Sequence, residues 1–515
     1  MSLAAALRAR ETPDAMALGD ERRSVTWEEL DSILNRAANA LLSLDLSRER
    51  RVAVFAENSI ETVLAHLAGI LVGVSTVPVN FHLTASEVSY ILEDSGSAAL
   101  FVGPETAETG VKAAAEAGVQ TVVGWRSDEH AVLSWSEWLT RGANDEPPAD
   151  MAPRPYLHYT SGTTGRPKGT ETPPTMFAGG ETVREHFEKI APDALANRDA
   201  GPGLVVSPLY HTGPLGAVRG VAAGIPLVVL GRFDAERTLW AIDTYRISSV
   251  LMVPTHFQRL LALPAETRAK YDVSSMQMIA HTGAACPVDV KRAMIDWFGP
   301  VLFEAYGATE AGSTNAITSP EWLEHPGSVG RTLPPFELLI VDDDGNELPQ
   351  GETGQIYFRD TTGRGIKYHN DEEKTAAAHL RPGVFTLGEV GYADPDGYLY
   401  ITDRSSDMVV SGGVNIYPAE TEQVLVEHPA VADVAVVGVP NPEMGEELKA
   451  LVVLAAGVGE PTKDELDAFC RDRLAGYKVP RSYDFVPDIG RNTMGKINKR
   501  KLRAPYWPTD RTIGG

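Results

Sequence analysis

The fold class is decided by LVV (residues 204–206), PLVVL (226–230), SVLMV (249–253) and MQMIA (276–280). Each run is short, continuous and apolar, and segments with helical patterning separate one run from the next. Buried strands of a parallel sheet have this texture, because helices cover both faces of such a sheet. The sequence therefore predicts an α/β protein with mostly parallel sheets covered by helices.

The same alternation extends toward the N-terminus. TWEE at residues 26–29 is a capping box that predicts a helix to about Leu44, and RVAVF at 51–55 predicts a strand. A second helix is expected over residues 60–72. These elements belong to a large N-terminal domain.

The texture changes after residue 337. ELLIVDDDGNEL, GQIYFRD and GYADPDGYLYITD are short strand patterns joined by Asp-Gly and Pro-Asp-Gly turns, which predicts a β-rich subdomain. Beyond it we expect a helix over 418–427, strands over 431–439 and 448–454, and a helix capped by Thr462 with Glu465. We predict two domains: residues 1–405, and a small mobile α+β domain over residues 406–515.

Composition limits the function classes. The chain has 515 residues, 43% hydrophobic and 23% charged, with a formal charge of −24 that argues against non-specific binding to nucleic acid or an anionic membrane. No apolar run of transmembrane length appears and no secretory signal precedes the domain, so we expect a cytoplasmic protein. Cys286 and Cys470 are far apart, which favours neither a disulfide framework nor a zinc site.

The segment YTSGTTGRPKGT, residues 159–170, carries the strongest chemical signal. Its hydroxyls can donate hydrogen bonds to phosphate, its glycines permit close backbone approach, and its lysine supplies charge. It is not a Walker A loop, because Pro167 precedes the lysine. Composition alone also fits a flexible surface loop. The predicted phosphate-binding residues are Thr160, Ser161, Gly162, Thr163, Thr164, Gly165 and Lys168.

Read in order, this segment resembles the signature loop of the adenylate-forming superfamily, which includes AMP-forming acyl-CoA synthetases, adenylation domains and beetle luciferases. Later motifs follow in the order expected for that superfamily, and the resemblance covers the chain from Met1 to about Arg503. Those motifs are SPLYHTGPLG (207–216), HTGAAC (281–286), YGATEAG (306–312), TLGEVGYADPDGYLYITDRSSD (386–407), SGGVNIYPAE (411–420) and RNTMGKINKRKL (491–502).

The resemblance implies a role for single residues in the N-terminal domain. His211 would lie between the nucleotide and acyl sites, Thr164 would assist catalysis, and Glu310 would act in catalysis as the ligand of Mg²⁺. Alone, His211 would more simply be a loop histidine, and Glu310 a solvated charge. The adenine and phosphates would contact Gly283, Ala284, Ala285, Tyr306, Gly307 and Thr309.

Two further sites follow from the resemblance near the domain boundary. Glu389 and Arg404 would bind the ribose, although this chain reads Leu-Gly-Glu at residues 387–389 where relatives usually have Thr-Gly-Asp. Ser406 aligns with a hinge that is usually Asp or Lys. The turn of Ser411, Gly412 and Gly413 would line the pantetheine tunnel.

Lys496 is the implied catalytic lysine, although it also fits a basic exposed tail. The resemblance implies that ATP activates a hydrophobic carboxylic acid as an acyl-adenylate, with Lys496 bridging the acid and the α-phosphate. Rotation about Ser406 would then withdraw Lys496 and bring residues 411–413 to the thiol of coenzyme A. The expected cofactors are ATP, Mg²⁺ and coenzyme A.

Three alternatives stay open at this level. The enzyme could load a carrier protein or perform only one half-reaction, it could be a luciferase, or it could be an inactive acyl- or nucleotide-binding homologue. The presence of Lys168, Glu310 and Lys496 together argues against the inactive homologue. The sequence is compatible with a homodimer, and it does not identify the acid.

Overall fold

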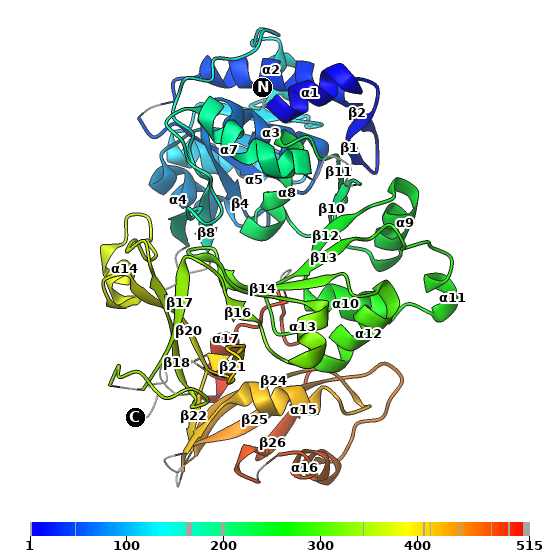
Figure 1. The fold of residues 1–515 in the computed structure, drawn as a ribbon, viewed down its shortest axis with the longest axis vertical. Helices are drawn as coiled ribbons and strands as arrows, with labels where there is room; N and C mark the ends of the chain where they lie inside the picture. The colour runs from blue at the N-terminus through cyan, green and yellow to red at the C-terminus, as the bar shows by residue number, and fades with distance from the viewer. Residues whose placement is uncertain are drawn as a thin grey trace.

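The structure is a computed structural model that describes residues 3–46, 48–160, 167–196, 201–342, 344–404, 407–411, 414–441, 444–474, 476–492 and 495–507. Figure 1 shows three tiers, with the N-terminal lobe at the top, a large sheet in the middle and the C-terminal domain at the bottom. Within the described ranges, no helix is long and apolar enough to cross a membrane.

The N-terminal lobe contains a parallel five-stranded sheet. Its strands, in spatial order, are β4 (Ser75–Val79), β3 (Arg51–Phe55), β5 (Ser97–Val102), β6 (Thr121–Gly124) and β7 (Leu133–Ser134). Helices α4 (Ala85–Ser95) and α5 (Ala107–Ala117) pack on one face through an apolar cluster that includes Phe55 and Leu100.

The middle tier is a nine-stranded sheet with a parallel centre. Its strands, in spatial order, are β16 (Arg331–Thr332), β15 (Gly312–Thr318), β14 (Leu302–Ala308), β13 (Met278–His281), β12 (Ser249–Met252), β10 (Gly203–Val205), β11 (Leu227–Val229), β1 (Met16–Asp20) and β2 (Ser24–Thr26). The four apolar runs that predicted the fold class form β10, β11, β12 and β13, which confirms the α/β prediction.

Helices fill the space between these two sheets. The apolar cluster there joins α2 (Trp27–Leu42), α3 (Ile60–Leu71) and α8 (Thr212–Ala222) to strands of both sheets. On the other face of the large sheet, a second cluster joins α9 (Ala235–Tyr245), α10 (Pro254–Leu261) and α12 (Val288–Phe298). The helix α8 is therefore packed between the two sheets through its apolar side chains, and one of its ends lies at the candidate site.

Remaining helices of the N-terminal region lie at the periphery. They are α1 (Leu3–Glu11), α6 (Trp135–Leu139), α7 (Val183–Ala196), α11 (Ala265–Arg268) and α13 (Ser319–Glu324). The predicted start of α2 is confirmed by a capping box, in which the Glu29 amide donates to Thr26 Oγ1 at 3.2 Å and the Thr26 amide donates to Glu29 Oε2 at 2.9 Å.

The predicted β-rich subdomain is an antiparallel sheet, seen at the left of Figure 1. Its strands are β17 (Phe336–Val341), β18 (Gly354–Asp360), β19 (His379–Arg381), β20 (Val384–Ala393) and β21 (Leu399–Arg404), with α14 (Glu372–Ala377) between β18 and β19. A cluster that includes Phe358 and Phe385 forms its core.

The C-terminal part has its own sheet and core. Its elements are β22 (Val409–Ser411), β23 (Val414–Ile416), α15 (Pro418–Leu425), β24 (Val431–Asn441), β25 (Gly445–Leu454), α16 (Lys463–Arg471), β26 (Ser482–Phe485) and α17 (Lys499–Arg503). The predicted Thr462–Glu465 capping box is present. The boundary at residues 405 and 406 lies outside the described residues and stays a prediction.

Candidate active site

The predicted phosphate loop is the tip of a two-stranded hairpin. Strand β8 (Leu157–Thr160) pairs with β9 (Lys168–Glu171), and Thr160 lies opposite Lys168. The tip itself lies outside the described residues, as does the side chain of Thr160. The predicted residues in that tip are Ser161, Gly162, Thr163, Thr164 and Gly165. The structure therefore describes the base of the loop, from which Lys168 projects.

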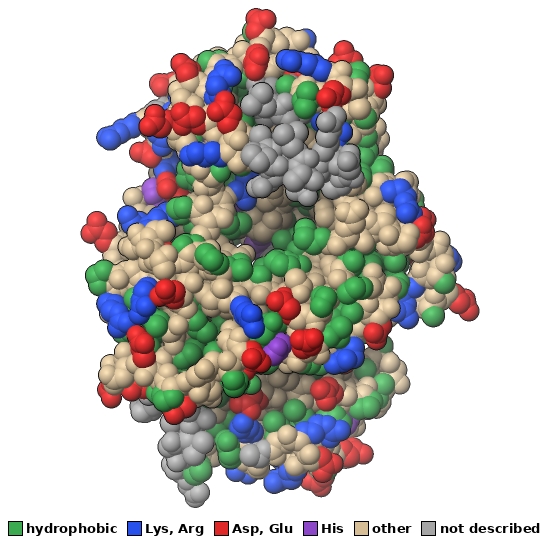
Figure 2. Space-filling model, in the orientation of Figure 1, with side chains coloured by type: hydrophobic (Ala, Val, Ile, Leu, Met, Phe, Trp, Pro, Cys, Tyr) green, Lys and Arg blue, Asp and Glu red, His purple; other side chains and the backbone are tan. Residues whose placement is uncertain are grey.

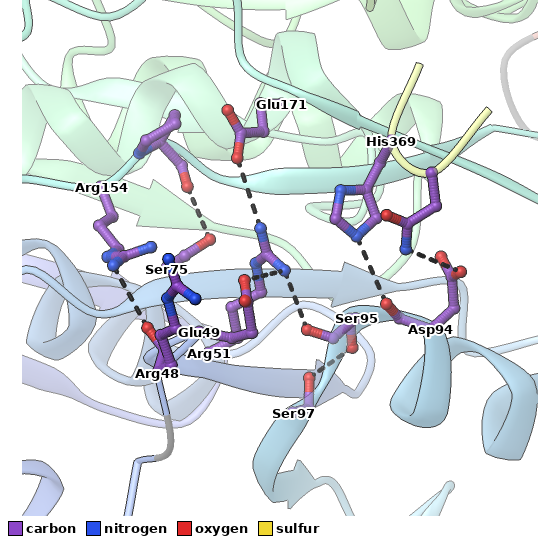
Figure 3. A network of polar contacts seen from close by, with 12 residues as sticks. Arg48, Glu49, Arg51, Ser75, Asp94, Ser95, Ser97, Arg154, Glu171 and His369 are labelled. Atoms are coloured by element: carbon purple, nitrogen blue, oxygen red, sulfur yellow. Dashed lines mark hydrogen bonds and ion pairs between the residues drawn. The ribbon is translucent and has the colours of Figure 1, made fainter. Parts of the chain in front are cut away.

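Contacts from two sides hold the hairpin base (Figure 3). From the N-terminal lobe, Asp94 at the end of α4 accepts a 2.6 Å hydrogen bond from Tyr159 Oη. From the β-rich subdomain, the His369 amide donates to the Gly169 carbonyl at 2.7 Å, and the His369 ring contacts the Asp94 carbonyl at 3.4 Å. Arg51 is buried beside the hairpin and contacts Glu171 at 3.4 Å. These contacts fix the direction in which the loop leaves the sheet.

A cluster of charges lies beside the loop. Lys168 Nζ forms a 2.5 Å ion pair with Asp371 Oδ2, and the Lys374 ammonium lies 3.8 Å from the centre of the Tyr368 ring. Burial and a hydrogen bond with Glu310 raise the pKa of Tyr368, while burial lowers the pKa of Lys374 despite the nearby Glu310 carboxylate. The Lys374 ammonium therefore interacts with Glu310, while Lys168 is paired with Asp371. Both are cations that can neutralise phosphate oxygens.

The surroundings of Glu310 suit a magnesium ion bound together with phosphates. In the described residues, the single group of three potential metal ligands is His325, Asp394 and Asp396, so Glu310 is not part of a complete protein cage. Mg²⁺ is usually held by one or two carboxylates plus waters and substrate phosphates. One carboxylate with a neighbouring lysine, and without a full set of protein ligands, fits that pattern.

The predicted adenine and ribose residues come from neighbouring strands. Tyr306 on β14 donates a 2.8 Å hydrogen bond to Glu389 Oε2 on β20, and Glu389 pairs with Arg404 in the sheet register. The turn of Gly283, Ala284 and Ala285 follows β13, and Gly283 has φ of +93°. The longer Glu389 side chain thus ends on the tyrosine that is expected to stack on the base.

A buried ion pair supports the adenine turn from below. Lys291 on α12 is 1% exposed, and its Nζ lies 2.5 Å from Glu304 Oε2 on β14. Burial raises the pKa of Glu304, and the attraction of Lys291 opposes this shift. Because α12 begins shortly after the turn and Tyr306 lies on β14, the pair fixes the two segments that are expected to bind adenine relative to each other.

His211 occupies the N-terminal end of α8. Its ring is buried, its Nε2 has no hydrogen-bond partner among the described residues, and its pKa is lowered to about 3 by burial and by the charge of Lys496. The next residue, Thr212, donates a 3.2 Å hydrogen bond to Thr309 Oγ1. The N-terminal end of α8 therefore contacts the YGATE segment through Thr212 and interacts electrostatically with Lys496 through His211.

Lys496 reaches His211 because its turn is docked on the N-terminal region. Gly495 has φ of +72°, and a side-chain Cβ at that position would stand 3.1 Å from Thr255 Cγ2 at the start of α10. The Lys496 amide donates to Asn492 Oδ1 at 2.9 Å, which tightens the turn. The contact requires a glycine, because the conformation is left-handed and the approach is close.

Arg491 ties the same turn to the C-terminal sheet. It holds Asp433 at the start of β24 through two hydrogen bonds of 2.6 and 2.7 Å, and it donates to the Gly495 carbonyl at 2.7 Å. A two-pronged arginine–carboxylate contact fixes geometry as well as charge. The lysine turn therefore moves together with the C-terminal sheet.

The predicted thiol-side turn lies elsewhere. Ser411 ends β22, where it pairs with Val414 and Gly445, while Gly412 and Gly413 lie outside the described residues. In Figure 1, β22 is at the lower left, well separated from β14. The side chain of Arg404 is also outside the described part. The structure brings Lys496 to the site and keeps Ser411 away from it.

Comparison with known proteins agrees with this geometry. The sequence model of the AMP-binding enzyme family matches residues 6–364, and that of the AMP-binding enzyme C-terminal domain matches residues 420–496. The chain belongs to the AMP-binding enzyme family. Membership confirms the predicted resemblance to adenylate-forming enzymes and the predicted class, AMP-forming acid–thiol ligase.

Full-length relatives share the whole architecture of this AMP-binding enzyme. Feruloyl-CoA synthase from Amycolatopsis sp is 34% identical, with 97% of each chain covered. Fatty acid–[acyl-carrier-protein] ligase ScoC from Streptomyces coeruleorubidus is 33% identical, with 97% of this chain and 95% of ScoC covered. The amide bond synthetase McbA from Marinactinospora thermotolerans has a similar structure, with a TM-score of 0.81, 28% identity and 98% and 99% coverage.

The AMP-binding enzyme has an apolar cavity of about 240 Å³ between α8 and the large sheet. Leu204, Val206 and Leu251 line it from the strands, and Gly213, Gly216 and Ala217 line it from α8. His256 on α10 is buried and stacks on Phe233 with ring centroids 3.8 Å apart. Figure 2 shows the molecular surface hollowed between the top lobe and the middle tier.

Several residues of this site were not predicted. Asp371, Lys374 and Tyr368 come from the segment between β18 and β19, which contains no motif that we used. Arg491 and Asp433 were missed because they act through Gly495 rather than on the substrate. A lysine or tyrosine in a polar segment has no periodic signal, so their positions emerge only when the subdomain packs against the phosphate hairpin.

Proposed function

We propose that this AMP-binding enzyme is an ATP-dependent carboxylic acid–CoA ligase that acts on a hydrophobic acid. The observation that carries the proposal is the docked lysine turn. Gly495 contacts Thr255, and Lys496 acts electrostatically on His211 at the end of α8, the helix that borders the apolar cavity. An acid in the cavity would present its carboxylate to Lys496.

In the first half-reaction, a carboxylate oxygen attacks the α-phosphorus and the bond to pyrophosphate breaks. Two anions must approach each other, so the main task is to neutralise and orient charge. Lys496 would bridge the acid and the α-phosphate, and Lys168 with residues 160–165 would bind the outer phosphates. Lys374 is a second cation for the departing pyrophosphate, given its place beside Glu310.

The nucleotide would be held by the turn of residues 283–285, by Tyr306 and Gly307, and by Glu389 and Arg404 at the ribose. Glu310 would hold Mg²⁺, which supplies positive charge to the phosphates when it is bound. His211 is neutral at physiological pH, because burial and Lys496 lower its pKa to about 3. A neutral ring can border an apolar acid without adding a charge there.

In the second half-reaction, the sulfur of coenzyme A attacks the acyl carbon, the bond to AMP breaks, and the thiol proton goes to solvent. The lysine turn occupies the approach to the acid, so the C-terminal domain must turn about Ser406 before the thiol enters. That rotation would withdraw Lys496 with Arg491 and bring residues 411–413 to the site. The protein would act in the cytoplasm, as a monomer or a homodimer.

The test separates the two half-reactions. Purified protein is given Mg²⁺ and ATP with a panel of acids, and acid-dependent pyrophosphate exchange is measured beside thioester formation with coenzyme A. We expect both activities on the same hydrophobic acid. Exchange without consumption of coenzyme A would contradict the proposed acceptor, and a carrier protein or an amine would then be tried, since ScoC and McbA have other acceptors in their names. No exchange with any acid would overturn the proposal.

A further inference from the structure

The neighbourhood of α8 contains several buried polar atoms without partners. Among the described residues, no hydrogen bond reaches Tyr156 Oη, His158 Nδ1, Ser207 Oγ or His211 Nε2. Buried polar groups are almost always hydrogen-bonded in folded proteins, and each exception needs a reason. Ser207 lines the apolar cavity. The rings of Tyr156, which precedes β8, and His158 on β8 are 6.0 Å apart. Their concentration in one place indicates a site that a ligand completes.

Arg219 brings a positive charge to this neighbourhood. It lies on α8, and its Nη2 is 3.9 Å from the position that a Cβ would take at Gly216, a cavity-lining residue. The charge of Arg219 acts on Tyr156, His158 and His186, so the guanidinium faces β8 and α7. Arg219 is neither fully buried nor fully exposed, so its side chain lies partly within the protein.

No carboxylate among the described residues offsets this charge. In the part of the chain that the structure describes, no carboxylate forms an ion pair with Arg219, and its titratable neighbours are a tyrosine and histidines. Burial lowers the pKa of Arg219 and of both histidines, so the histidines are neutral while the guanidinium stays charged. A buried charge without a counter-ion costs several kcal/mol, and a carboxylate is the anion that a guanidinium binds best.

The distance from the reaction centre fits the far end of a substrate. Gly216 follows His211 by five residues, which corresponds to roughly 7–8 Å along the axis of α8. The helix face between them carries Gly213 and Gly216, so it leaves room for an apolar chain. A molecule with one carboxylate at Lys496 would extend along this face to Arg219.

We propose that the acid activated by this enzyme is a dicarboxylic acid with an apolar body, whose second carboxylate binds Arg219. One carboxylate becomes the acyl-adenylate, and the other stays ionised in a contact with the guanidinium. Tyr156 Oη and Ser207 Oγ are additional donors for the second carboxylate or for water beside it. This inference rests on the proposed function, because it names the substrate of the same site.

The first experiment measures pyrophosphate exchange with straight-chain monocarboxylic, oxo-monocarboxylic and dicarboxylic acids matched in length. We expect the wild-type kcat/KM for a medium-length dicarboxylic acid to exceed that of the matched monocarboxylic acid by about 10- to 100-fold, the range of a charge-assisted hydrogen bond. Arg219→Met should remove this preference, because kcat/KM for the dicarboxylic acid falls far more than that for the matched monocarboxylic acid. Arg219→Lys should restore part of it.

Arg232→Met is the matched control, because Arg232 is 76% exposed and pairs with Glu57 on the surface. It should keep the wild-type preference. A wild-type preference for monocarboxylic or oxo acids at every length would overturn the proposal, and so would an equal loss on both acid classes in Arg219→Met. If no acid supports exchange, the proposed function fails instead.

A second measurement does not need turnover. A dicarboxylic acid that binds the folded protein raises its melting temperature in proportion to occupancy, without ATP. We expect a shift for the wild type and for Arg232→Met, and a shift reduced by at least half for Arg219→Met. The unliganded Arg219→Met protein should be at least as stable as the wild type, since a buried unpaired charge is removed. An equal ligand-induced shift in all three proteins would contradict the role of Arg219.

Discussion

The nucleotide side and the acid side of the site differ in how their polar groups are satisfied. On the nucleotide side, Lys168 is paired with Asp371, and Tyr306 donates to Glu389. On the acid side, Tyr156 Oη and Ser207 Oγ have no partner among the described residues, and Arg219 has no carboxylate. We expect His211 to lie between the two sides.

This difference in hydrogen bonding suits a fold in which the nucleotide stays the same and the acid varies. The nucleotide is always ATP, so its binding groups can be held in advance by other protein groups, which avoids reorganisation when the substrate binds. The acid varies among relatives. A polar group that has no protein partner favours an acid that can bind it, because an acid without the matching group leaves it unpaired and binds less well. Four predictions test whether this division is real.

The largest effect is expected at the lysine that serves both sides. Lys496→Ala should lower acid-dependent pyrophosphate exchange by about 10²- to 10³-fold, because a preorganised charge at the α-phosphate is lost. Thioester formation from a synthetic acyl-adenylate should stay near the wild-type rate. Lys501→Ala, an exposed change on α17, is the control. Equal loss in both assays would show that Lys496 is not specific to adenylation.

Acid should destabilise the protein through the acid side. Burial lowers the pKa of His66, His158 and His211 to about 3, below the value of about 6.5 in an unfolded chain. Between these values the unfolded chain binds more protons, so stability falls as the pH falls through this range. At pH 5.5 the loss should be about 1.4 kcal/mol for each of these rings, or about 4 kcal/mol for the three together. Burial also lowers the pKa of His186, His256 and His281, so these rings add to the loss.

Urea unfolding at pH 7.5 and 5.5 measures this loss. His158→Gln should reduce the difference between the two pH values by the contribution of one ring, about 1.4 kcal/mol. A change at the exposed His82 should leave the difference unaltered. If stability is the same at both pH values, the three rings are not held neutral and the acid side is less closed than described.

A smaller effect is expected from Tyr306→Phe on the nucleotide side. The change removes a 2.8 Å hydrogen bond to the Glu389 carboxylate, and bonds to charged groups contribute about 1.5–3 kcal/mol when buried. The pair is partly buried, so we expect the free energy of unfolding to fall by about 1–2 kcal/mol. Chemical denaturation of the unliganded protein measures it, and no loss would mean that the nucleotide side is not organised in advance.

The smallest effect is expected from the matching change on the acid side. Tyr156→Phe removes a hydroxyl that has no partner among the described residues, so the free energy of unfolding should change by less than about 0.5 kcal/mol or increase. The same denaturation assay compares it with Tyr306→Phe. A larger loss at Tyr156 than at Tyr306 would reverse the comparison between the two sides.

Local signals explain most of what could be predicted. The capping boxes at Thr26 and Thr462 and the apolar runs of β10 to β13 depend on neighbours in sequence, and their elements were found with ends shifted by a few residues. Long-range pairing was not predicted. Strand β1 joins the large sheet beside β11, more than 200 residues later, because only the folded chain brings these edges together.

The candidate site divides in the same way. The ordered motifs led to Lys168, His211, Glu310 and Lys496 through a resemblance, and their roles stay proposals. Arg219 was missed because an arginine on a helix usually predicts a solvated face; its significance comes from β8 and α7, which are distant in sequence. The contact of Gly495 with Thr255 spans 240 residues, which no local pattern encodes.

The link between Arg491 and Gly495 has a consequence for observing the enzyme at work. Arg491 binds the lysine turn to the C-terminal sheet, so Lys496 would move with that sheet in the proposed rotation. The charge of Lys496 would then no longer lower the pKa of His211. The pKa of His211 would thus depend on the position of the C-terminal domain. The ring resonances of a single histidine, followed by NMR while nucleotide is added, would serve as a built-in gauge of how often the enzyme is open.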